Sequence, residues 1–425
     1  MFKVFVNAEQ TFDKIIFCLY NFFKVSVIVM EKVAIFRCEE YTDQQVMSAL
    51  KQALDAFGGA KAFAKPGQLV VIKANMVIKF APERCATTHP VVVGCLAKLF
   101  LDEGAKVVVA DSAGGPYNDR YMGAIYDATG MTDASKKYGF EMNSNYGTAC
   151  VEYSDAKVAK KFNVLDILQK ADVIVNACKL KSHSFTGISN AVKNMFGAIP
   201  GLDKVQMHGQ FQTLDNFSDM LFDIWGFFGN KMALSVCDAV VGMEGEGPTN
   251  GKPRKIGAIM CSPNPVALDV VGARVMNVDA AQMPTITKGV ERNYLDAVDD
   301  FEVVGEPWQN FVLTDFDKRT PNPFKPFSNS VPQWLQPILH KLTTQRPYVS
   351  KRKCVGCQTC FRHCPVHAIS MVAQKKGGVA KAKFDYSKCI RCFCCQELCP
   401  YGLVKVKSGI VYKVLHGKSK KDKSK

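Results

Sequence analysis

The sequence predicts an α/β fold, with a mostly parallel sheet and helices on both faces, followed by a small α+β domain at the C-terminus. Short β-branched runs alternate with helical patterns from residue 30 to about 315, proline becomes frequent between 316 and 345, and a cysteine motif occurs twice after residue 346. A chain of 425 residues, 48% hydrophobic and 22% charged, is long enough for two or three globular domains of ordinary composition.

Residues 1–29 precede the first predicted strand. The stretch IIFCLYNFFKVSVIVM at 15–30 is apolar, but it is shorter than the roughly 20 residues that span a bilayer and it contains Asn21 and Lys24. No small-residue cleavage site follows it, so we do not expect a signal peptide. Because Met30 opens a new strand pattern, we interpret residues 1–29 as an extension or misplaced start outside the folded domain. A peripheral membrane helix is the alternative.

The α/β domain is expected over residues 30–315. Continuous apolar strands separated by helices are typical of a parallel sheet that is buried on both faces. Four runs are the expected strands: QLVVIKANMV (68–77), AKVVVADSAGG (105–115), ADVIVNACKLKSH (171–183) and MALSVCDAVVG (232–242). Helical patterns lie between them, including 43–57, 90–104 and 157–170. The order of the strands in the sheet stays open at this point.

Polar residues collect where these strands end, which is where open α/β sheets place their functional groups. Grouped lysines suit an anionic substrate such as a phosphate or a carboxylate, and a histidine there can transfer protons near neutral pH or bind a metal. For a lone histidine, a hydrogen-bonded structural role is the alternative. The candidate catalytic residues are Lys73, Asp111, Lys179, Lys181 and His183. The candidates for binding a substrate or a second cofactor are Asn75, Ser112, Lys193, Asn194, Glu244 and Glu246.

The last two candidates lie in a glycine-rich segment, GMEGEGPTNGKP (242–253). It resembles a phosphate-binding loop, but Glu246 occupies a position where the Walker A motif requires glycine, and Pro253 follows Lys252 in place of Ser or Thr. Two acids among glycines could bind a metal or a substrate amine and close over the site. A mobile surface loop is the alternative.

Residues 316–345 are expected to form a proline-rich linker with a short helix near 333–343. The domain that follows, residues 346–414, contains one cysteine motif twice. KCVGCQTCFRHCP (353–365) and KCIRCFCCQELCP (388–400) align without gaps, and both have the spacing C-x2-C-x2-C-x3-C-P of bacterial ferredoxins. In two-cluster ferredoxins the fourth cysteine of each motif ligates the other cluster. The spacing thus predicts one [4Fe–4S] cluster on Cys354, Cys357, Cys360 and Cys399, and a second on Cys389, Cys392, Cys395 and Cys364.

Cys394 has no counterpart in the first motif, because Thr359 occupies that position, so we do not expect it to bind metal. A C-x2-C pair also suits zinc, but two full motifs that each end in proline favour clusters. The remaining eight of the 17 cysteines are scattered singly, with no spacing that suggests a disulfide framework. Iron–sulfur clusters indicate a reducing, low-oxygen environment, so we expect a cytoplasmic and anaerobic protein.

The net charge of +15 is concentrated near the C-terminus. Residues 345–425 hold 19 Lys and Arg against 3 acids, a local charge of +16, whereas the first 344 residues hold 35 against 36. A basic surface around a redox centre attracts an acidic electron carrier, such as a flavodoxin or a ferredoxin, or an anionic membrane in peripheral contact. Nucleic acid is the less favoured alternative partner, since the tail at 415–425 contains the lysine-rich run KSKKDKSK. For this run we favour a disordered, solubilising tail.

Several long motifs together resemble the family called domain of unknown function 362. They are VVIKANMV, ATTHPVVV, VVVADSAGG, VNACKLKSHSFTGISNAVKNMFGAIPG and DAVVGMEGEGPTNGKPRKIGAIMCSPNPVALD. The resemblance covers roughly residues 30–305 and 346–414, and the chain departs from the family pattern at Ala74, where proline is expected. Members often carry a C-terminal ferredoxin module with two clusters. The resemblance therefore implies this architecture, while the chemistry of the family is unassigned.

Two clusters in series form an electron wire or a two-electron store. Joined to an α/β domain with a pocket, they predict an iron–sulfur oxidoreductase that exchanges electrons with a small, anionic substrate or with a second cofactor whose identity the sequence leaves open. Two alternatives remain. The large domain could only dock partners of an electron carrier or scaffold, or the protein could be a non-redox lyase or isomerase with structural clusters.

Overall fold

The computed structural model describes residues 30–321, 332, 335, 342–350, 352–374 and 378–410. The expected N-terminal extension (1–29), the basic tail (415–425) and most of the expected linker, with its helix near 333–343, lie outside the described residues. Among the helices that the structure describes, none has both the length and the apolar composition needed to cross a bilayer.

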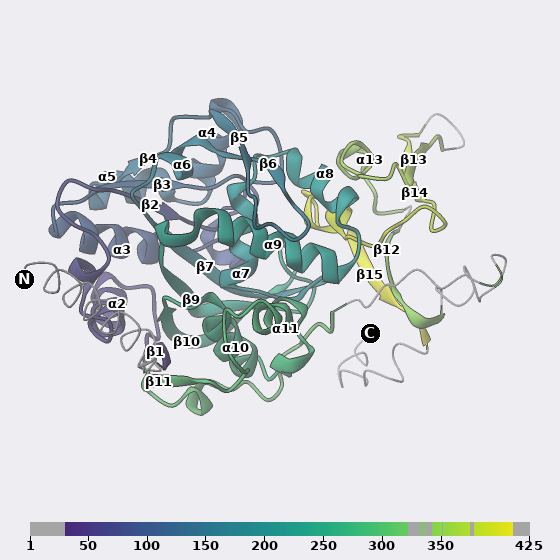
Figure 1. Cartoon of the computed structure of the whole chain (residues 1–425). Helices are drawn as coiled ribbons and strands as arrows, with labels where there is room; N and C mark the ends of the chain where they lie inside the picture. Colours follow the sequence, from purple (N-terminus) through teal and green to yellow (C-terminus); the bar gives the residue numbers. More distant parts are fainter. Residues whose placement is uncertain are drawn as a thin grey trace, which may run out of the picture.

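A nine-stranded mixed sheet forms the centre of the α/β domain (Figure 1). All neighbours from β9 to β4 pair in parallel, while β10 is antiparallel to both of its neighbours, so the sheet is mostly parallel as expected. The strand order is β11 (Phe301–Gly305), β1 (Glu31–Arg37), β10 (Lys252–Ser262), β9 (Met232–Glu244), β7 (Val173–His183), β2 (Leu69–Lys73), β3 (Lys106–Ala110) and β4 (Glu141–Met142), with β8 (Gly187–Ser189) paired to the end of β7. The four expected strands form β2, β3, β7 and β9.

Helices cover both faces of the sheet and create two hydrophobic cores. Side chains alternate along β2, so Val70 and Ile72 enter one core and Val71 enters the other. The first core contains α2 (Asp43–Asp55), α3 (Pro90–Asp102), α4 (Asp119–Ala128) and α5 (Met131–Tyr138). The second contains α7 (Ala191–Asn194), α9 (Leu214–Phe228), α10 (Pro265–Val275) and α11 (Pro284–Glu291). Burial on both faces explains why the central strands are continuously apolar in sequence.

The helix expected at 157–170 is wrong for most of its length. The chain forms a hairpin of β5 (Thr148–Glu152) and β6 (Lys161–Leu165), and only α6 (Asp166–Lys170) is helical. Phe162 and Val164 are buried and stand opposite Val151 and Ala149 across the hairpin. Buried apolar side chains at every second position are typical of a strand, which explains why these residues are not helical.

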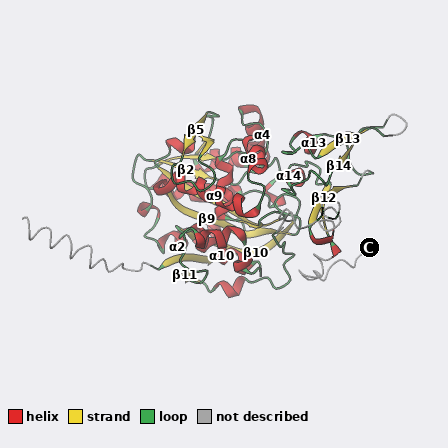
Figure 2. Cartoon of the chain, turned by 45° about the vertical axis from the view of Figure 1, so that its right-hand side comes forward, coloured by secondary structure: helices red, strands yellow, loops and turns green. Residues whose placement is uncertain are grey.

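The cysteine-rich domain is a separate small lobe beside the α/β domain (Figure 2). In the residues that the structure describes, it has two antiparallel strand pairs and two short helices. The pairs are β12 (Gln345–Val349) with β15 (Val404–Ser408), and β13 (Ile369–Val372) with β14 (Lys381–Phe384). The helices α13 (Thr359–Arg362) and α14 (Cys394–Glu397) lie at equivalent places in the two cysteine motifs. We call residues 353–365 the first loop and residues 388–400 the second loop.

Candidate functional site

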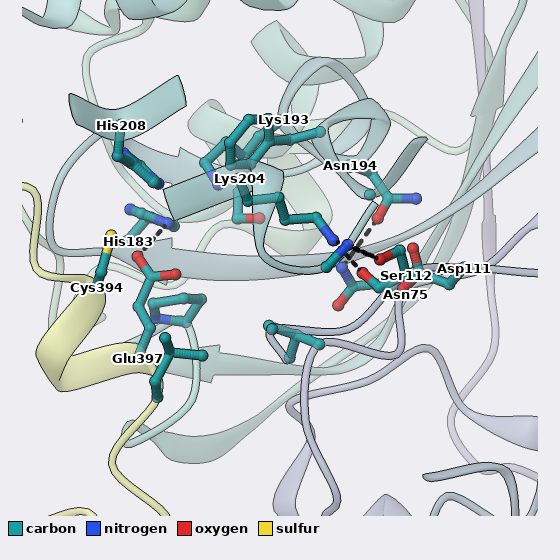
Figure 3. A pocket seen from close by; sticks show the side chains of 18 of the residues that line it. Asn75, Asp111, Ser112, His183, Lys193, Asn194, Lys204, His208, Cys394 and Glu397 are labelled. Atoms are coloured by element: carbon teal, nitrogen blue, oxygen red, sulfur yellow. Dashed lines mark hydrogen bonds and ion pairs between the residues drawn. The ribbon is translucent and has the colours of Figure 1, made fainter. Parts of the chain in front are cut away.

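A cavity of about 90 Å³ lies where the α/β domain meets the second loop (Figure 3). Its walls come from the carboxyl ends of β2, β3 and β7, from α7 and α8 (Asp203–Gln210), and from α14 of the cysteine-rich domain. We call it the interdomain cavity. The α/β domain contributes Lys73, Asn75, Asp111, Ser112, Lys181, His183, Lys193, Asn194, Lys204 and His208, and the second loop contributes Cys394, Glu397 and Leu398.

The structure brings eight of the eleven expected site residues of the α/β domain to this cavity. They come from segments more than a hundred residues apart, because parallel strands deliver their carboxyl ends to the same edge of the sheet. Lys179, Glu244 and Glu246 are the three that do not line it. Lys204, His208, Cys394 and Glu397 line it without having been expected.

Lys73 and Asp111 form a buried ion pair at the floor of the cavity. The Nζ atom of Lys73 lies 2.6 Å from Oδ1 of Asp111, and Oδ2 of Asp111 accepts a hydrogen bond of 2.5 Å from the backbone of Met76. Burial lowers the pKa of Lys73, and the carboxylate of Asp111 opposes this effect. A Cβ atom at Gly197 would lie 2.2 Å from Oδ1 of Asp111, so the chain needs glycine there for the pair to form. The two charges neutralise each other.

Lys181 and Lys204 also line the cavity, but neutral oxygens hold their ammonium groups. Lys181 donates to Oδ1 of Asn75 and to the carbonyl of Ala86, both at 2.7 Å. Lys204 donates to the carbonyl of Ser112 at 2.5 Å and to its hydroxyl at 2.9 Å. Burial, without a carboxylate in direct contact, lowers the pKa of each lysine to about 7. Both groups therefore titrate near neutral pH.

Lys193 differs from the other cavity lysines. Among the described residues its Nζ atom makes no hydrogen bond or ion pair, and it lies 5.1 Å from the ring centre of Phe196 and 5.6 Å from that of Phe217. Burial lowers the pKa of Lys193, and Glu397 partly opposes this effect. The residue is half-buried, and cation–π contacts of this kind replace only part of the hydration that its ammonium group loses.

His183 connects the two domains through Glu397. Its Nδ1 atom accepts hydrogen bonds from the backbone of Phe185 at 3.1 Å and of Thr186 at 3.2 Å. Its Nε2 atom lies 3.2 Å from Oε1 of Glu397. Burial and the nearby Lys193 lower the pKa of His183, so the neutral ring carries its proton on Nε2 and directs it toward Glu397.

Glu397 is the acidic residue that the second loop brings to the cavity. Burial would raise the pKa of Glu397, but His183, Lys193 and His208 together outweigh burial and hold it at about 2. His208 lies near by, stacked on Phe217 with ring centres 4.7 Å apart, and burial lowers its pKa to about 3. The carboxylate thus stays charged beside two neutral imidazoles.

Lys179 belongs to a second polar cluster, outside the cavity. Its Nζ atom lies 2.8 Å from Oδ2 of Asp238 and 2.7 Å from the hydroxyl of Tyr41. The ring of Tyr41 stacks on His89 at 3.6 Å. Lys179 and Asp238 are buried, Tyr41 and His89 are half-buried, and the ammonium group is paired with a carboxylate, as is typical of a structural ion pair.

Glu246 holds the cysteine-rich domain in place and does not close over the cavity. Its carboxylate lies 3.2 Å from Nζ of Lys405, and its carbonyl accepts a 3.2 Å hydrogen bond from the side chain of Gln396. Asn250 donates to the carbonyl of Gln396 at 2.8 Å, and Thr249 donates to the carbonyl of Glu397 at 3.0 Å. Glu244 accepts a 3.2 Å hydrogen bond from the backbone of Asp317. The glycine-rich segment is therefore a docking loop.

Glycines allow the two domains to approach closely. A Cβ atom at Gly114 would lie 2.3 Å from Cδ2 of Leu398, and one at Gly209 would lie 3.2 Å from Pro365. On the other side of the contact, a Cβ atom at Gly402 would lie 2.7 Å from Asn250. Larger side chains at these positions would push the cysteine-rich domain away from the α/β domain.

The two cysteine loops share one backbone geometry, repeated 35 residues apart. Each loop, together with the two residues that follow it, contains residues in the left-handed region at the same places, and non-glycine residues occupy several of them. The equivalent pairs are Gly356 (φ 72°) and Arg391 (φ 58°), Gln358 (φ 65°) and Phe393 (φ 63°), and His367 (φ 50°) and Gly402 (φ 60°). Backbone that curls in this way turns successive cysteines to the same side of a loop.

The cysteines of the first expected ligand set lie together in the structure. A second cavity, of about 20 Å³, is lined by all four cysteines that the sequence assigns to the first cluster: Cys354, Cys357, Cys360 and Cys399. In the other set, burial raises the pKa of Cys389 to about 11, with further contributions from the neighbouring Cys392 and Cys364.

Backbone N–H groups point at the fourth cysteine of each motif. Ala368 donates to Sγ of Cys364 at 3.2 Å, and Leu403 donates to Sγ of Cys399 at 3.3 Å. Such hydrogen bonds stabilise thiolates that bind iron. No group of three His, Cys, Asp or Glu side chains in the described residues is arranged around a single ion. The thiols of a cubane site stand farther apart than the ligands of one ion.

The sequence contains signals that could have identified some of the unexpected cavity residues. Lys204 and His208 are four residues apart, so they share one face of α8. Glu397 is one of only 3 acids in the strongly basic residues 345–425. Cys394 was set aside as a metal ligand, and the structure places it in the cavity wall instead.

Comparison with known proteins supports the two-part organisation. Residues 70–274 match the family model of a domain of unknown function, DUF362, and residues 353–403 match that of a 4Fe-4S dicluster domain. The expected combination of domains is confirmed, and the protein binds iron–sulfur clusters.

Three curated proteins are similar to parts of the chain. A thylakoid-associated protein of Synechocystis sp. is 29% identical over 265 residues, which are 61% of this chain and 78% of that protein. The pyruvate synthase subunit PorD of Thermotoga maritima is 38% identical over 55 residues, 13% of this chain and 50% of that protein. A dihydromethanopterin reductase (acceptor) of Methanosarcina mazei is 36% identical over 80 residues, 18% and 31% respectively.

Among solved structures, the lactate racemase apoprotein of Thermoanaerobacterium thermosaccharolyticum is similar at 14% sequence identity. The match has a TM-score of 0.36 and covers 56% of this chain and 55% of that one.

Proposed function

We propose that this chain, which joins a domain of unknown function 362 to an iron–sulfur domain, is an oxidoreductase that exchanges electrons with a small molecule in the interdomain cavity. One observation carries the proposal. The helix α14 contains Cys395, an expected ligand of the second cluster, and the same turn of chain supplies Cys394, Glu397 and Leu398 to the cavity wall. The expected electron source and the cavity thus share one element.

When bound, each [4Fe–4S] cluster supplies the exchange of one electron, and we propose two of them, on the two ligand sets given above. The protein's own part is to hold the cysteines and to separate the two sites. Cys357 in the first loop is exposed, whereas Cys392 and Cys395 in the second loop are buried. This difference in exposure favours the first loop as the place where electrons enter and the second as the place where they reach the cavity.

The surroundings of the first loop favour an acidic electron carrier, such as a flavodoxin or a ferredoxin, as the partner. Val355 and Tyr401 line the small cavity of the first ligand set, and they are 46% and 59% exposed. The local charge of residues 345–425, +16 before any cluster is bound, attracts an acidic surface to this lobe. Apolar contacts inside a charged rim are typical of transient interfaces.

Reduction of most small molecules also consumes protons, and the cavity can hold and deliver them. His183 keeps a proton on Nε2 at the cavity wall. Lys181 carries another on an ammonium group whose pKa is about 7. Groups that titrate near the working pH are the most effective proton donors. The similarity to a reductase and to a pyruvate synthase subunit, printed in the names of two relatives, agrees with redox chemistry.

The test is a single-turnover experiment on the intact protein. The holoprotein is reduced with dithionite without oxygen, freed of excess reductant and mixed with a panel of small-molecule acceptors. We expect one class of acceptor to re-oxidise the clusters, seen in their visible absorbance, and to be converted to product. Replacement of Cys392 by Ser should abolish this conversion. Full conversion in that variant would overturn the proposal.

A second candidate is non-redox chemistry, such as that of a lyase or an isomerase. It is favoured by Lys181, because a lysine with a pKa of about 7 is partly neutral at pH 7 and can act as a base or a nucleophile. In this case the clusters are structural, and turnover survives their oxidation. The same Cys392 variant distinguishes the two candidates.

A further inference from the structure

The interdomain cavity has more positive than negative groups. Among the described residues, two carboxylates face it, those of Asp111 and Glu397, against four ammonium groups. The lysines are Lys73, Lys181, Lys193 and Lys204. When all four are protonated the cavity carries a surplus of two positive charges. Burying such a surplus costs free energy unless an anion balances it.

The two carboxylates do not compensate the surplus. Asp111 is paired with Lys73 at 2.6 Å, and Glu397 lies against His183 at 3.2 Å. Three lysines therefore remain without a carboxylate in direct contact: two are held by neutral oxygens, and Lys193 has only aromatic rings. A buried charge that the protein leaves unpaired is commonly paired by a ligand.

A further polar atom in the cavity wall lacks a partner. His208 is 4% exposed, and its Nδ1 atom has no hydrogen-bond partner in the part of the chain that the structure describes. His208 and Lys193 both contact the ring of Phe217, so they face the same part of the cavity. Lys204 lies one helical turn before His208 on α8. Donors from two elements thus converge on one region.

The size of the cavity limits what can bind. One water molecule needs roughly 10–15 Å³ on this scale of volume, and the cavity has about 90 Å³. It therefore has room for a small ion, or for one end of a larger substrate, but not for a whole nucleotide.

We infer that the interdomain cavity binds a small oxyanion group with a charge of about −2, held by Lys193, Lys204 and Lys181. A phosphate and a compact dicarboxylate share this chemistry. The inference rests on the proposed function, because we take the oxyanion group to be part of the substrate that exchanges electrons with the clusters. Anion binding also explains why one buried lysine, Lys181, and two half-buried ones, Lys193 and Lys204, face the cavity without a carboxylate in direct contact.

The test measures binding and does not depend on turnover. Isothermal titration calorimetry on the oxidised holoprotein, at constant ionic strength, uses inorganic phosphate, sulfate and malonate as three separate probes, with chloride as the reference. We expect at least one of the three to bind saturably while chloride does not. Phosphate and sulfate binding without malonate would identify a phosphate-type group, and the reverse would identify a dicarboxylate. If none of the three binds, the inference is wrong.

Replacement of Lys193 by Met supplies the decisive variant. It should weaken binding of the preferred anion by about 10–100-fold, because hydrogen bonds to charged groups are the strong ones. It should also raise the melting temperature without anion, since it removes a half-buried charge that has no carboxylate in direct contact and keeps the apolar stem. A variant that failed to fold would lower that temperature instead. Lys136→Met is the matched control, because it removes one positive charge from a side chain that is 73% exposed.

The outcomes separate this inference from the proposed function. Anion binding that is lost in Lys193→Met, in a protein whose clusters convert no acceptor, would support the anion site and overturn the oxidoreductase. Cluster-dependent turnover of a neutral molecule, with no anion binding, would support the oxidoreductase and overturn the anion site. Equal weakening by Lys193→Met and Lys136→Met would show only long-range attraction and would overturn the anion site.

Discussion

The two cysteine loops have the same motif and the same backbone, but different surroundings. Cys357 of the first loop is exposed to solvent, whereas every cysteine at 392–399 in the second loop is buried. At equivalent positions 35 residues apart, the first loop has Thr359 and Arg362, and the second has Cys394 and Glu397. The cysteine spacing therefore sets the local structure. The residues between the cysteines decide which loop faces solvent and which faces the interdomain cavity.

The largest effect should come from removing one cluster at a time. With an electron-donor protein, Cys357→Ser and Cys392→Ser should each lower turnover more than about 100-fold, because an interrupted relay passes no electrons. With dithionite as the donor, Cys357→Ser should recover most of its activity, since a small reductant can reach the second loop directly. Iron analysis should show the loss of one cluster in each variant. Equal behaviour with dithionite would contradict the assigned direction of the relay.

The next prediction compares the same kind of substitution at equivalent positions of the two loops. Glu397→Gln should lower kcat by about 10–100-fold, because the neutral amide removes the negative charge that favours a proton on His183 at the cavity wall. Arg362→Gln, at the equivalent position on exposed α13, is the matched control and should change kcat with dithionite less than about two-fold. Steady-state kinetics and iron content would be measured on both. An equal loss in the two variants would place the effect in the clusters and not in the cavity.

The contact that holds the second loop against the cavity can be broken at Gly114. In Gly114→Val a side chain would collide with Leu398, whose Cδ2 atom lies 2.3 Å from the position of a Cβ atom. We expect a loss of about 1–3 kcal/mol in the free energy of unfolding, as for other overpacked sites. Gly123→Val is a control, because a Cβ atom at Gly123 meets nothing within 4 Å. Faster proteolysis between the two domains in Gly114→Val alone would confirm that this contact holds them together.

The cavity should also make stability depend on pH. The pKa values of Lys181 and Lys204 are about 7 in the folded chain, and a lysine in the unfolded chain has a pKa near its usual value of about 10.4. Between these values the unfolded chain binds more protons, so their contribution to stability rises from pH 7 upward and is least below pH 7. The melting temperature of the oxidised protein should therefore increase between pH 7 and 9. The increase should be smaller in Lys181→Met, and an unchanged slope would contradict the assignment.

The smallest effect should follow from making the second loop more similar to the first. Cys394→Thr places the residue found at position 359 into the second loop. Because Cys394 lies outside both expected ligand sets, iron and sulfide content should not change. A shift in substrate affinity is allowed, since Cys394 lines the cavity. The loss of one cluster would show that Cys394 is a ligand after all.

The sequence by itself determined the features that depend on local patterns. Continuous apolar runs predicted β2, β3, β7 and β9, because strands buried on both faces need apolar residues throughout. Cysteine spacing predicted the iron–sulfur loops, because the reach of a tight turn decides which thiols share a site. Position at strand ends found six residues of the interdomain cavity, since parallel strands end at one edge of the sheet, whereas Lys193 and Asn194 lie on α7. The helix expected at 157–170 was wrong because an apolar period of two and one of 3.6 are hard to separate over so few residues.

Only the tertiary structure decided what those residues face. Lys179 and Lys181 are two positions apart on β7, but one meets Asp238 and Tyr41 while the other meets only neutral oxygens in the cavity. Glu397 reaches His183 from 214 positions along the chain, by way of a domain that docks through Glu246. Contacts between residues so far apart leave no periodic trace in the sequence. They depend on shape and charge at an interface, which exists only once both domains have folded.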